Sequence, residues 1–334
     1  MGLSVAVVEI QDIYDEFNHG IFNPRAIRDF LSYAYHHWTP PAPTYVLLVG
    51  DATQDYKDNL RTGTVNFVPS QIIETDLLGE TPSDNWFVLV SGDDILPDML
   101  IGRLSVQSVS QAEAVVDKII RYEQQPPDDT RNTQALLVAD DDSPVFEDIS
   151  EQLAALFPPD YVTHKVYAGD YPPGDPTTEI LQYIDDGTIL VNYTGHGSVS
   201  RWGQWHGGNS ILRRSDVTAL QNLDQLPIVT VANCLNGFFT GRKTQVSIAE
   251  AFLRHPGAGA VAVWAPTALG YPSGQRVLLR EFYEAVFQGE PQTLGEATTT
   301  AKIASAGQSR TWDELVETFV LFGDPAMRMG IPSR

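Results

Sequence analysis

The sequence has one cysteine, Cys234, among 334 residues. A single cysteine forms no internal disulfide, and it excludes the cysteine-rich zinc sites, which need several thiolates. No apolar run approaches the ~20 residues of a membrane-spanning helix, so no membrane span is expected. The short apolar start lacks the basic region and the cleavage site of a secretory signal peptide.

Basic residues are also scarce. The chain has 21 Lys and Arg against 43 Asp and Glu, which gives a net charge of −22. Such a surface repels phosphate backbones, and we therefore expect no nucleic-acid partner. No G-x-G-x-x-G follows a strand pattern and no P-loop is present, which disfavours a nucleotide-dependent oxidoreductase.

Hydrophobic residues make up 43% of the chain and occur as short runs that alternate with helical patterns. The runs are continuous, as in strands of a parallel sheet that helices cover on both faces. This alternation predicts an α/β fold. Strands are expected at 3–10, 45–50, 86–90, 135–140, 188–193, 228–232, 260–264 and 319–323, and helices at 24–38, 111–125, 247–255, 274–288 and 294–305.

A proline pair interrupts the pattern in QQPPDDTRNT (124–133), where a helix ends and a new strand begins. Such a break is typical of a boundary between structural units. We therefore predict two subdomains, residues 1–127 and 128–334.

Two predicted strands each end at a reactive side chain. ILVNYTGHGS (189–198) carries His196, and PIVTVANCLN (228–237) carries Cys234. Ligands of open α/β sheets bind beyond the carboxyl ends of strands, so neighbouring strands would bring both side chains into one crevice. An imidazole can take the proton of a thiol, and the thiolate is a nucleophile for acyl transfer. Either residue alone is more often structural; the pair favours catalysis.

These motifs resemble the His-Gly and Ala-x-Cys motifs of the caspase-fold cysteine peptidases, and of the gingipain family in particular. YVLLVGDAT (45–53), LIGRLSVQSVSQAEAVVDKIIRYE (100–123) and FVLFGDPAMRM (319–329) extend the resemblance over nearly the whole chain. It implies a caspase-like αβα sandwich with mostly parallel sheets and two subdomains side by side. Relatives have a further strand and helix upstream of LSVAVVEI (3–10), a unit that this sequence lacks.

The resemblance also implies a catalytic set. Cys234 would be the nucleophile and His196 the general acid/base, and the N–H groups of Gly197 and Cys234 would hold the oxyanion. The family's acidic third member lies just before an I-G-R motif, which in PDMLIGR (97–103) indicates Asp98. A carboxylate there would orient the histidine. The alternative is that Asp98 is one acid of an acid-rich loop.

Four further positions are candidates for the substrate pocket. Gln111 takes the place of the acid that binds a basic P1 side chain in Arg- or Lys-specific relatives, and a neutral amide does not pair with a guanidinium. Thr194 and Tyr271 are candidate pocket walls, and Trp202, in SRWGQWHGG (200–208), is a candidate wall or lid. For each, a packing role is the alternative.

The predicted reaction requires no cofactor, although Ca²⁺ stays open as a structural ion. GDATQDYKDN (50–59) and ADDDSP (139–144) carry carboxylates after strands. The first lacks the D-x-D-x-D-G spacing of a calcium loop, which favours a solvated loop. In the second, Ser143 or Asp142 is predicted to cap a helix that begins at Val145. Neither segment defines a ligand set.

The sequence thus predicts a cysteine endopeptidase that acts on protein or peptide substrates. Two alternatives stay open: a sortase-like transpeptidase of the same family, in which an amine replaces water, and a non-catalytic scaffold with this fold. The family resemblance implies a secreted or cell-surface location. The sequence does not define P1 specificity, the activation route or the oligomeric state.

Overall fold

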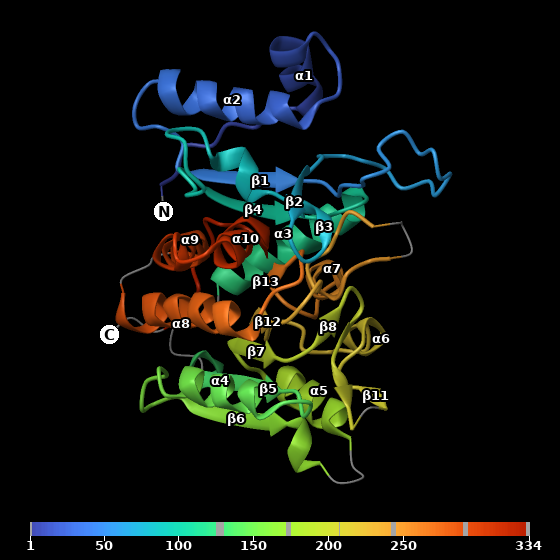
Figure 1. The fold of residues 1–334 in the computed structure, drawn as a ribbon, viewed down its shortest axis with the longest axis vertical. Coiled ribbons are helices and arrows are strands. Elements are labelled where there is room, and N and C mark those ends of the chain that lie inside the picture. Colours follow the sequence, from blue (N-terminus) through green and yellow to red (C-terminus); the bar gives the residue numbers. More distant parts are fainter. Residues whose placement is uncertain are drawn as a thin grey trace.

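An eight-stranded sheet crosses the molecule and carries both halves of the chain (Figure 1). A computed structural model describes residues 2–124, 130–171, 175–206, 208–241, 245–289 and 293–331. The strand order is β1-β4-β14-β13-β12-β7-β5-β6, and each neighbouring pair is parallel except β13 with β14. Therefore β5, β6, β7, β12 and β13 run in one direction, and β1, β4 and β14 run in the opposite one. The strands are β1 (Tyr45–Val49), β4 (Leu100–Leu104), β5 (Gln134–Ala139), β6 (Val162–Tyr167), β7 (Leu190–Thr194), β12 (Ile228–Ala232), β13 (Ala262–Pro266) and β14 (Phe319–Phe322).

Helices form a layer on each face of this sheet. Helices α4, α8, α9 and α10 contact one another in one layer, and α3, α5, α6 and α7 do so in the other. Helices α1 and α2 pack together beyond the β1 edge (Figure 1). The helices are α1 (Ile10–Asn18), α2 (Pro24–His37), α3 (Val109–Glu123), α4 (Pro144–Ala154), α5 (Pro176–Asp186), α6 (Arg214–Val217), α7 (Ile248–Arg254), α8 (Pro272–Gln288), α9 (Leu294–Ser305) and α10 (Arg310–Thr318).

The structure also contains short elements outside the main sheet. They are the 3₁₀ turns η1 (Asn85–Val88), η2 (Thr130–Thr133) and η3 (Ala168–Asp170), and three small ladders. The ladders pair β2 (Gln71–Thr75) with β3 (Gly79–Ser83), β8 (Gly197–Ser198) with β9 (Arg201–Trp202), and β10 (Gln204–Trp205) with β11 (Asn209–Ser210). No described helix is long and apolar enough to cross a membrane.

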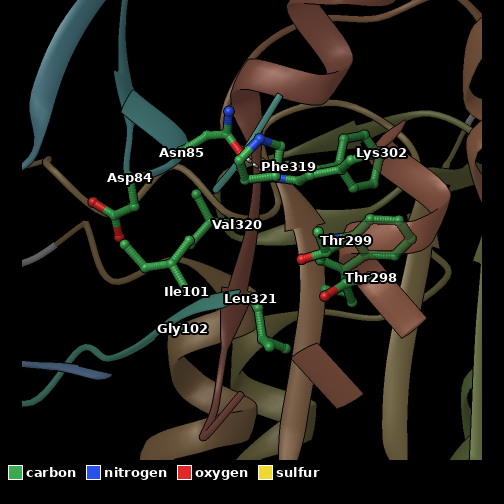
Figure 2. A pocket seen from close by; sticks show the side chains of 12 residues that line it. Asp84, Asn85, Ile101, Gly102, Thr298, Thr299, Lys302, Phe319, Val320 and Leu321 are labelled. Carbon is green, nitrogen blue, oxygen red and sulfur yellow. Dashed lines mark hydrogen bonds between the residues drawn. The ribbon is translucent and has the colours of Figure 1, made fainter. Parts of the chain in front are cut away.

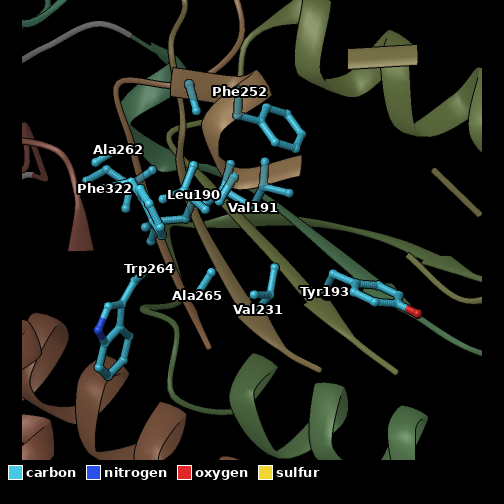
Figure 3. Packing of buried hydrophobic residues seen from close by; sticks show 14 of the residues in the cluster. Leu190, Val191, Tyr193, Val231, Phe252, Ala262, Trp264, Ala265 and Phe322 are labelled. Atoms are coloured by element: carbon cyan, nitrogen blue, oxygen red, sulfur yellow. The ribbon is translucent and has the colours of Figure 1, made fainter. Parts of the chain in front are cut away.

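The core is densest around the central strands. Every residue of β7, β12 and β13 is buried, because helices cover both faces of these strands. Figure 3 shows Leu190, Val231 and Trp264 among the side chains that fill this region. Burying one such side chain contributes roughly 1.5–3 kcal/mol. This packing fixes the strand ends that carry His196 and Cys234.

The structure confirms the α/β fold and corrects two predicted strands. Residues 3–9 form no strand, and Val5 and Val7 are 81% and 91% exposed. The described sheet ends at β1, and this apolar run does not extend it. Residues 86–90 contribute only the 3₁₀ turn η1. Strands β4 and β6 of the sheet and helices α1, α5, α6 and α10 were not predicted from the sequence pattern.

The predicted boundary between residues 127 and 128 lies outside the described residues. Two of the three hydrophobic clusters among the described residues bear on this division. One joins α1, α2, β1 and η1, whereas the largest includes Leu104 and Val115 from the first part of the chain together with residues of the second part. Strand β14 also pairs with β4 through Phe322 and Arg103. One sheet therefore connects the two parts.

Candidate active site

The candidate active site lies beyond the carboxyl ends of two neighbouring strands. In the parallel pair of β7 and β12, Thr194 lies opposite Ala232. The Gly195 N–H then donates to the Ala232 carbonyl at 3.0 Å, which continues the pairing past the strand ends. His196 and Cys234 each follow two residues after this last pair. The register therefore brings the imidazole and the thiol to the same edge of the sheet.

Tight turns hold the backbone on both sides of the site. Leu235, directly after the cysteine, has a φ of 64°, a left-handed conformation that is uncommon for a residue with a side chain. Such conformations persist where the surrounding structure imposes them, often at functional sites. The Leu235 N–H donates to the Ala268 carbonyl at 3.1 Å, and the Gln275 side chain donates to the Asn233 carbonyl. These bonds fix the direction of the Cys234 side chain.

Gly197 lies against the cysteine turn. A Cβ atom at this position would lie 2.6 Å from the Cys234 carbonyl oxygen and 2.7 Å from the Asn233 side-chain nitrogen. Only glycine permits this approach. Among the described residues, the Cys234 N–H donates to no acceptor. The turn thus presents a free backbone donor beside the thiol.

The thiol itself is partly buried. Its Sγ lies 3.9 Å from the Gly270 carbonyl oxygen, in the loop that precedes α8. Burial raises the pKa of Cys234 above that of an ordinary thiol. Little thiolate therefore forms at neutral pH unless a base takes the proton. His196, whose side chain is 64% exposed, carries an imidazole at the same edge of the sheet.

Three consecutive aspartates follow β5, and two of them, Asp140 and Asp142, lie next to His196. The Asp140 carboxylate accepts bonds from the His196 N–H at 2.9 Å and from the Tyr193 hydroxyl at 3.1 Å. Burial raises the pKa of Asp140. The Asp142 carboxylate lies 3.9 Å from His196 Nε2. Asp140 therefore fixes the backbone of the histidine, and Asp142 faces its ring.

Helix α4 completes the surroundings of the imidazole. Ser143 caps this helix by accepting a bond from the Val145 N–H at 3.4 Å, as the sequence predicted for Ser143 or Asp142. Because Ser143 is the cap, the Asp142 carboxylate is left to face His196. Phe146, in the first turn, packs edge-on against the His196 ring with centroids 5.3 Å apart.

Asp98 has a different set of contacts. Its carboxylate accepts bonds from the Val90 and Ser91 N–H groups, both at 2.8 Å. It precedes β4, which lies four strands from β7 in the sheet. At about 4.8 Å per strand, this separation is about 19 Å. The structure thus places Asp98 at the correct edge but too far along it to orient His196, and the carboxylate that faces this histidine is Asp142.

Two predicted pocket residues are buried instead. Trp202 has no exposed surface and stacks face to face on Tyr193, with centroids 4.5 Å apart. Thr194 is 1% exposed, and its hydroxyl donates to the Asn192 side chain at 3.0 Å. These contacts favour the packing alternative for both residues over a pocket role, because a fully buried side chain does not line a substrate pocket.

The structure places Gln111 far from Cys234 and Tyr271 close to it. Gln111 lies in α3, which follows the carboxyl end of β4, and β4 runs opposite to β12. Gln111 therefore lies at the far edge of the sheet, where its side chain accepts a bond from the Gln107 N–H at 2.8 Å. Tyr271 is 53% exposed and follows Gly270, the residue whose carbonyl contacts Cys234. Of the four, Tyr271 alone lies beside the nucleophile.

In the first acidic segment considered for calcium, the aspartates accept hydrogen bonds from nearby backbone N–H groups. Asp55 accepts bonds from the Asn59 and Leu60 N–H groups, and Asp58 accepts from Thr62 and Gly63. One oxygen from each of Asp140, Asp141 and Asp142 lies within 4.8 Å of the others, close enough for a cation in geometric terms. These three carboxylates also have protein partners, and we assign no ion to them.

A small cavity lies elsewhere, between α9 and the β4–β14–β13 part of the sheet (Figure 2). Lys302 points into it and donates to the Asn85 side chain at 3.0 Å. Burial lowers the pKa of Lys302 to about 7. Neither His196 nor Cys234 lines this cavity, so it is not part of the candidate active site.

Comparison with solved structures gives the same fold. The Arg-specific cysteine proteinase gingipain R superposes with a TM-score of 0.77 at 26% identity, covering 96% of this chain and 75% of that one. A complex of the pro- and mature domains of the Porphyromonas gingivalis enzyme RgpB also gives 0.77, at 25% identity, covering 96% of this chain and 73% of that one. The sheet and its two helical layers are those of the caspase-like fold.

Sequence comparison narrows the class to a family. The chain belongs to peptidase family C25, whose model matches residues 2–330. Gingipain R2 of Porphyromonas gingivalis is 27% identical over 307 residues, which are 85% of this chain and 37% of the relative. Lys-gingipain of the same organism is 27% identical over 192 residues, or 54% of this chain and 11% of the relative. The chain thus spans well under half of the length of these curated relatives.

Proposed function

We propose that this protein is a cysteine endopeptidase in which Cys234 attacks the peptide carbonyl and His196 carries the proton. The observation that carries the proposal is the β7–β12 register, which sets both residues two positions beyond the same strand pair. Membership of a cysteine peptidase family supports the same chemistry.

The reaction follows from the groups present. His196 takes the thiol proton, and the thiolate sulfur bonds to the carbonyl carbon of the substrate. The N–H groups of Cys234 and Gly197 hold the negative oxygen that results. His196 then gives its proton to the leaving amine, which breaks the peptide bond and leaves an acyl group on the sulfur. Water, activated by His196, releases that acyl group.

Asp142 takes the orienting role in this proposal. Its carboxylate faces His196 Nε2 and stabilises the imidazolium that forms when the thiol loses its proton. Phe146 borders the ring with an apolar edge and restricts its rotation. Tyr271, beside Gly270, is the proposed contact for the substrate side chain near the scissile bond.

The proposal includes the setting of the reaction. The substrate is a protein or peptide chain, no cofactor takes part, and the protein acts outside the cell or at its surface, as the family resemblance implies. The acidic surface, with a net charge of −22, is consistent with the absence of nucleic-acid partners.

A mixed peptide library tests the proposal. The protein and its Cys234→Ala variant are incubated with the library under reducing conditions, with calcium or with a chelator, and the products are identified by mass spectrometry. We expect cleavage by the protein, none by the variant, and the same cleavage with the chelator. A parallel reaction with added amine shows whether water or the amine receives the acyl group. Equal cleavage by the variant would contradict the proposal.

A further inference from the structure

A second histidine, His206, is connected to the aspartate turn that faces His196. Its backbone N–H donates to Asp141 Oδ2 at 3.0 Å, and its ring Nδ1 lies 2.9 Å from the same oxygen. Its ring Nε2 lies 2.6 Å from the carbonyl oxygen of Tyr171. The neighbouring Trp205 also donates to that carbonyl, at 3.2 Å. His206 therefore joins the turn after β5 to the segment after η3.

The ring of His206 lies between two hydrogen-bond acceptors. Both ring nitrogens face acceptors, one a carboxylate and the other a backbone carbonyl. A neutral imidazole carries only one N–H, whereas the imidazolium donates from both nitrogens. The arrangement is thus satisfied by a cationic His206 beside an anionic Asp141.

A cation at this position would reduce the repulsion between the carboxylates of the aspartate turn. The oxygens of Asp140, Asp141 and Asp142 lie within 4.8 Å of one another, and like charges at that distance repel. Asp141 Oδ1 is buried and has no partner among the described residues, so its charge is compensated through Oδ2 alone. Further acids surround the turn, and burial and neighbouring carboxylates raise the pKa of Glu147. The acids on these adjoining elements are Glu147 of α4 and Asp170 of η3.

We propose that His206 is a positioning residue of the proposed reaction: its imidazolium holds Asp141 and thereby keeps the turn in the conformation in which Asp142 faces His196. The inference rests on the proposed function. The three aspartates then have separate tasks. Asp140 holds the backbone of His196, Asp141 binds His206, and Asp142 faces the imidazole.

The test replaces His206 with a side chain that donates a hydrogen bond but carries no positive charge. In His206→Gln, we expect kcat/KM to fall about tenfold, mostly in kcat, because a small displacement of the orienting carboxylate impairs proton transfer. The acidic limb of the pH–rate profile should move to higher pH, because uncompensated Asp141 stabilises a protonated His196. His206→Lys retains the cation and should recover most of the rate and the original limb. His37→Gln, an exposed histidine on α2, is the matched control.

The pH dependence of Cys234 alkylation by iodoacetamide is measured on the same proteins, and it needs no peptide. If the parent protein cleaves no peptide, the proposed function is wrong. The alkylation profiles still test whether His206 is a positioning residue. A midpoint that moves upward in His206→Gln and returns in His206→Lys supports the inference. Profiles that coincide in all three proteins would overturn it. So would equal losses in both variants that follow their melting temperatures.

Discussion

At the scale of single residues, the carboxylate partner of His196 decides how the site works. Asp98 and Asp142 both lie at the catalytic edge of the sheet, but only Asp142 is within ion-pair distance of the imidazole. Asp98 instead holds the Val90 and Ser91 N–H groups. We therefore expect a substitution of Asp142 to lower kcat and a substitution of Asp98 to lower the free energy of unfolding.

Asp142→Asn should lower kcat by about 10- to 100-fold, because an amide does not stabilise the imidazolium. Asp98→Ala should leave kcat within about twofold and lower the free energy of unfolding by about 1–2 kcal/mol, the cost of unpaired N–H groups. Steady-state kinetics and urea unfolding of both variants measure these effects. A loss of kcat confined to Asp98→Ala would restore the sequence-based assignment.

At the scale of elements, the active site depends on close contact between the turns after β7 and β12. Gly197 lies so near the cysteine turn that a single added carbon atom has no space. A methyl group there would separate His196 from Cys234 without changing either side chain.

We expect Gly197→Ala to lower kcat by about 100-fold or more and to destabilise the fold by about 1–3 kcal/mol. Gly208→Ala is the matched control, because the nearest atom to its added Cβ is the Trp205 carbonyl at 3.7 Å. Peptide cleavage and thermal melting compare the two variants. Full activity in Gly197→Ala would show that the turns are not packed as described.

The sequence predicted most strands of the sheet and the two strand ends that carry His196 and Cys234. Strands β7, β12 and β13 were predictable because they are apolar throughout, as strands covered on both faces are. Asp142 was missed because ADDDSP also fits a helix cap, and the sequence pattern does not show which acid caps and which faces His196. For Trp202 the sequence left a pocket role and a packing role open, because its position in the sequence does not reveal its stacking on Tyr193.

The family resemblance placed Gln111 in the substrate pocket, and the sheet topology does not support this position. The antiparallel pairing of β13 with β14 reverses the direction of β14, β4 and β1, and the helix after β4 therefore begins at the opposite edge. A reversal of this kind depends on long-range strand pairing, which local apolar patterns do not encode.

At the scale of the whole molecule, a buried ionic cluster connects the two parts of the chain at the far edge of the sheet. Arg254, at the end of α7, bonds to Glu250 and lies 2.9 Å from Asp51, which follows β1. The Ser105 hydroxyl lies 2.7 Å from Asp51 and 2.9 Å from Glu250. Burial and the nearby Asp51 carboxylate raise the pKa of Glu250 to about 7, although the Arg254 guanidinium acts in the opposite direction.

This shift predicts a pH-dependent stability. The pKa of Glu250 in the folded protein exceeds its ordinary value of 4.5, so its contribution is complete below about pH 4.5 and is lost as the pH rises to about 7. Glu250→Gln does not titrate. The stability of the parent protein relative to this variant should therefore fall over that interval, on the order of 3 kcal/mol.

Urea unfolding at several pH values measures the difference, with Glu113→Gln, an exposed position on α3, as the control. A difference that stays constant from about pH 4.5 to pH 8 would show that Glu250 remains ionised throughout.

The central claim is that His196 activates Cys234, and the rate of Cys234 alkylation as a function of pH tests it most directly. Burial raises the pKa of this thiol, so rapid alkylation at neutral pH requires a base beside it. We predict rapid alkylation of the parent protein near pH 7, and alkylation of His196→Ala only at alkaline pH, with both proteins folded. Coincident profiles for the two proteins would contradict the account, because the imidazole would then have no effect on the thiol.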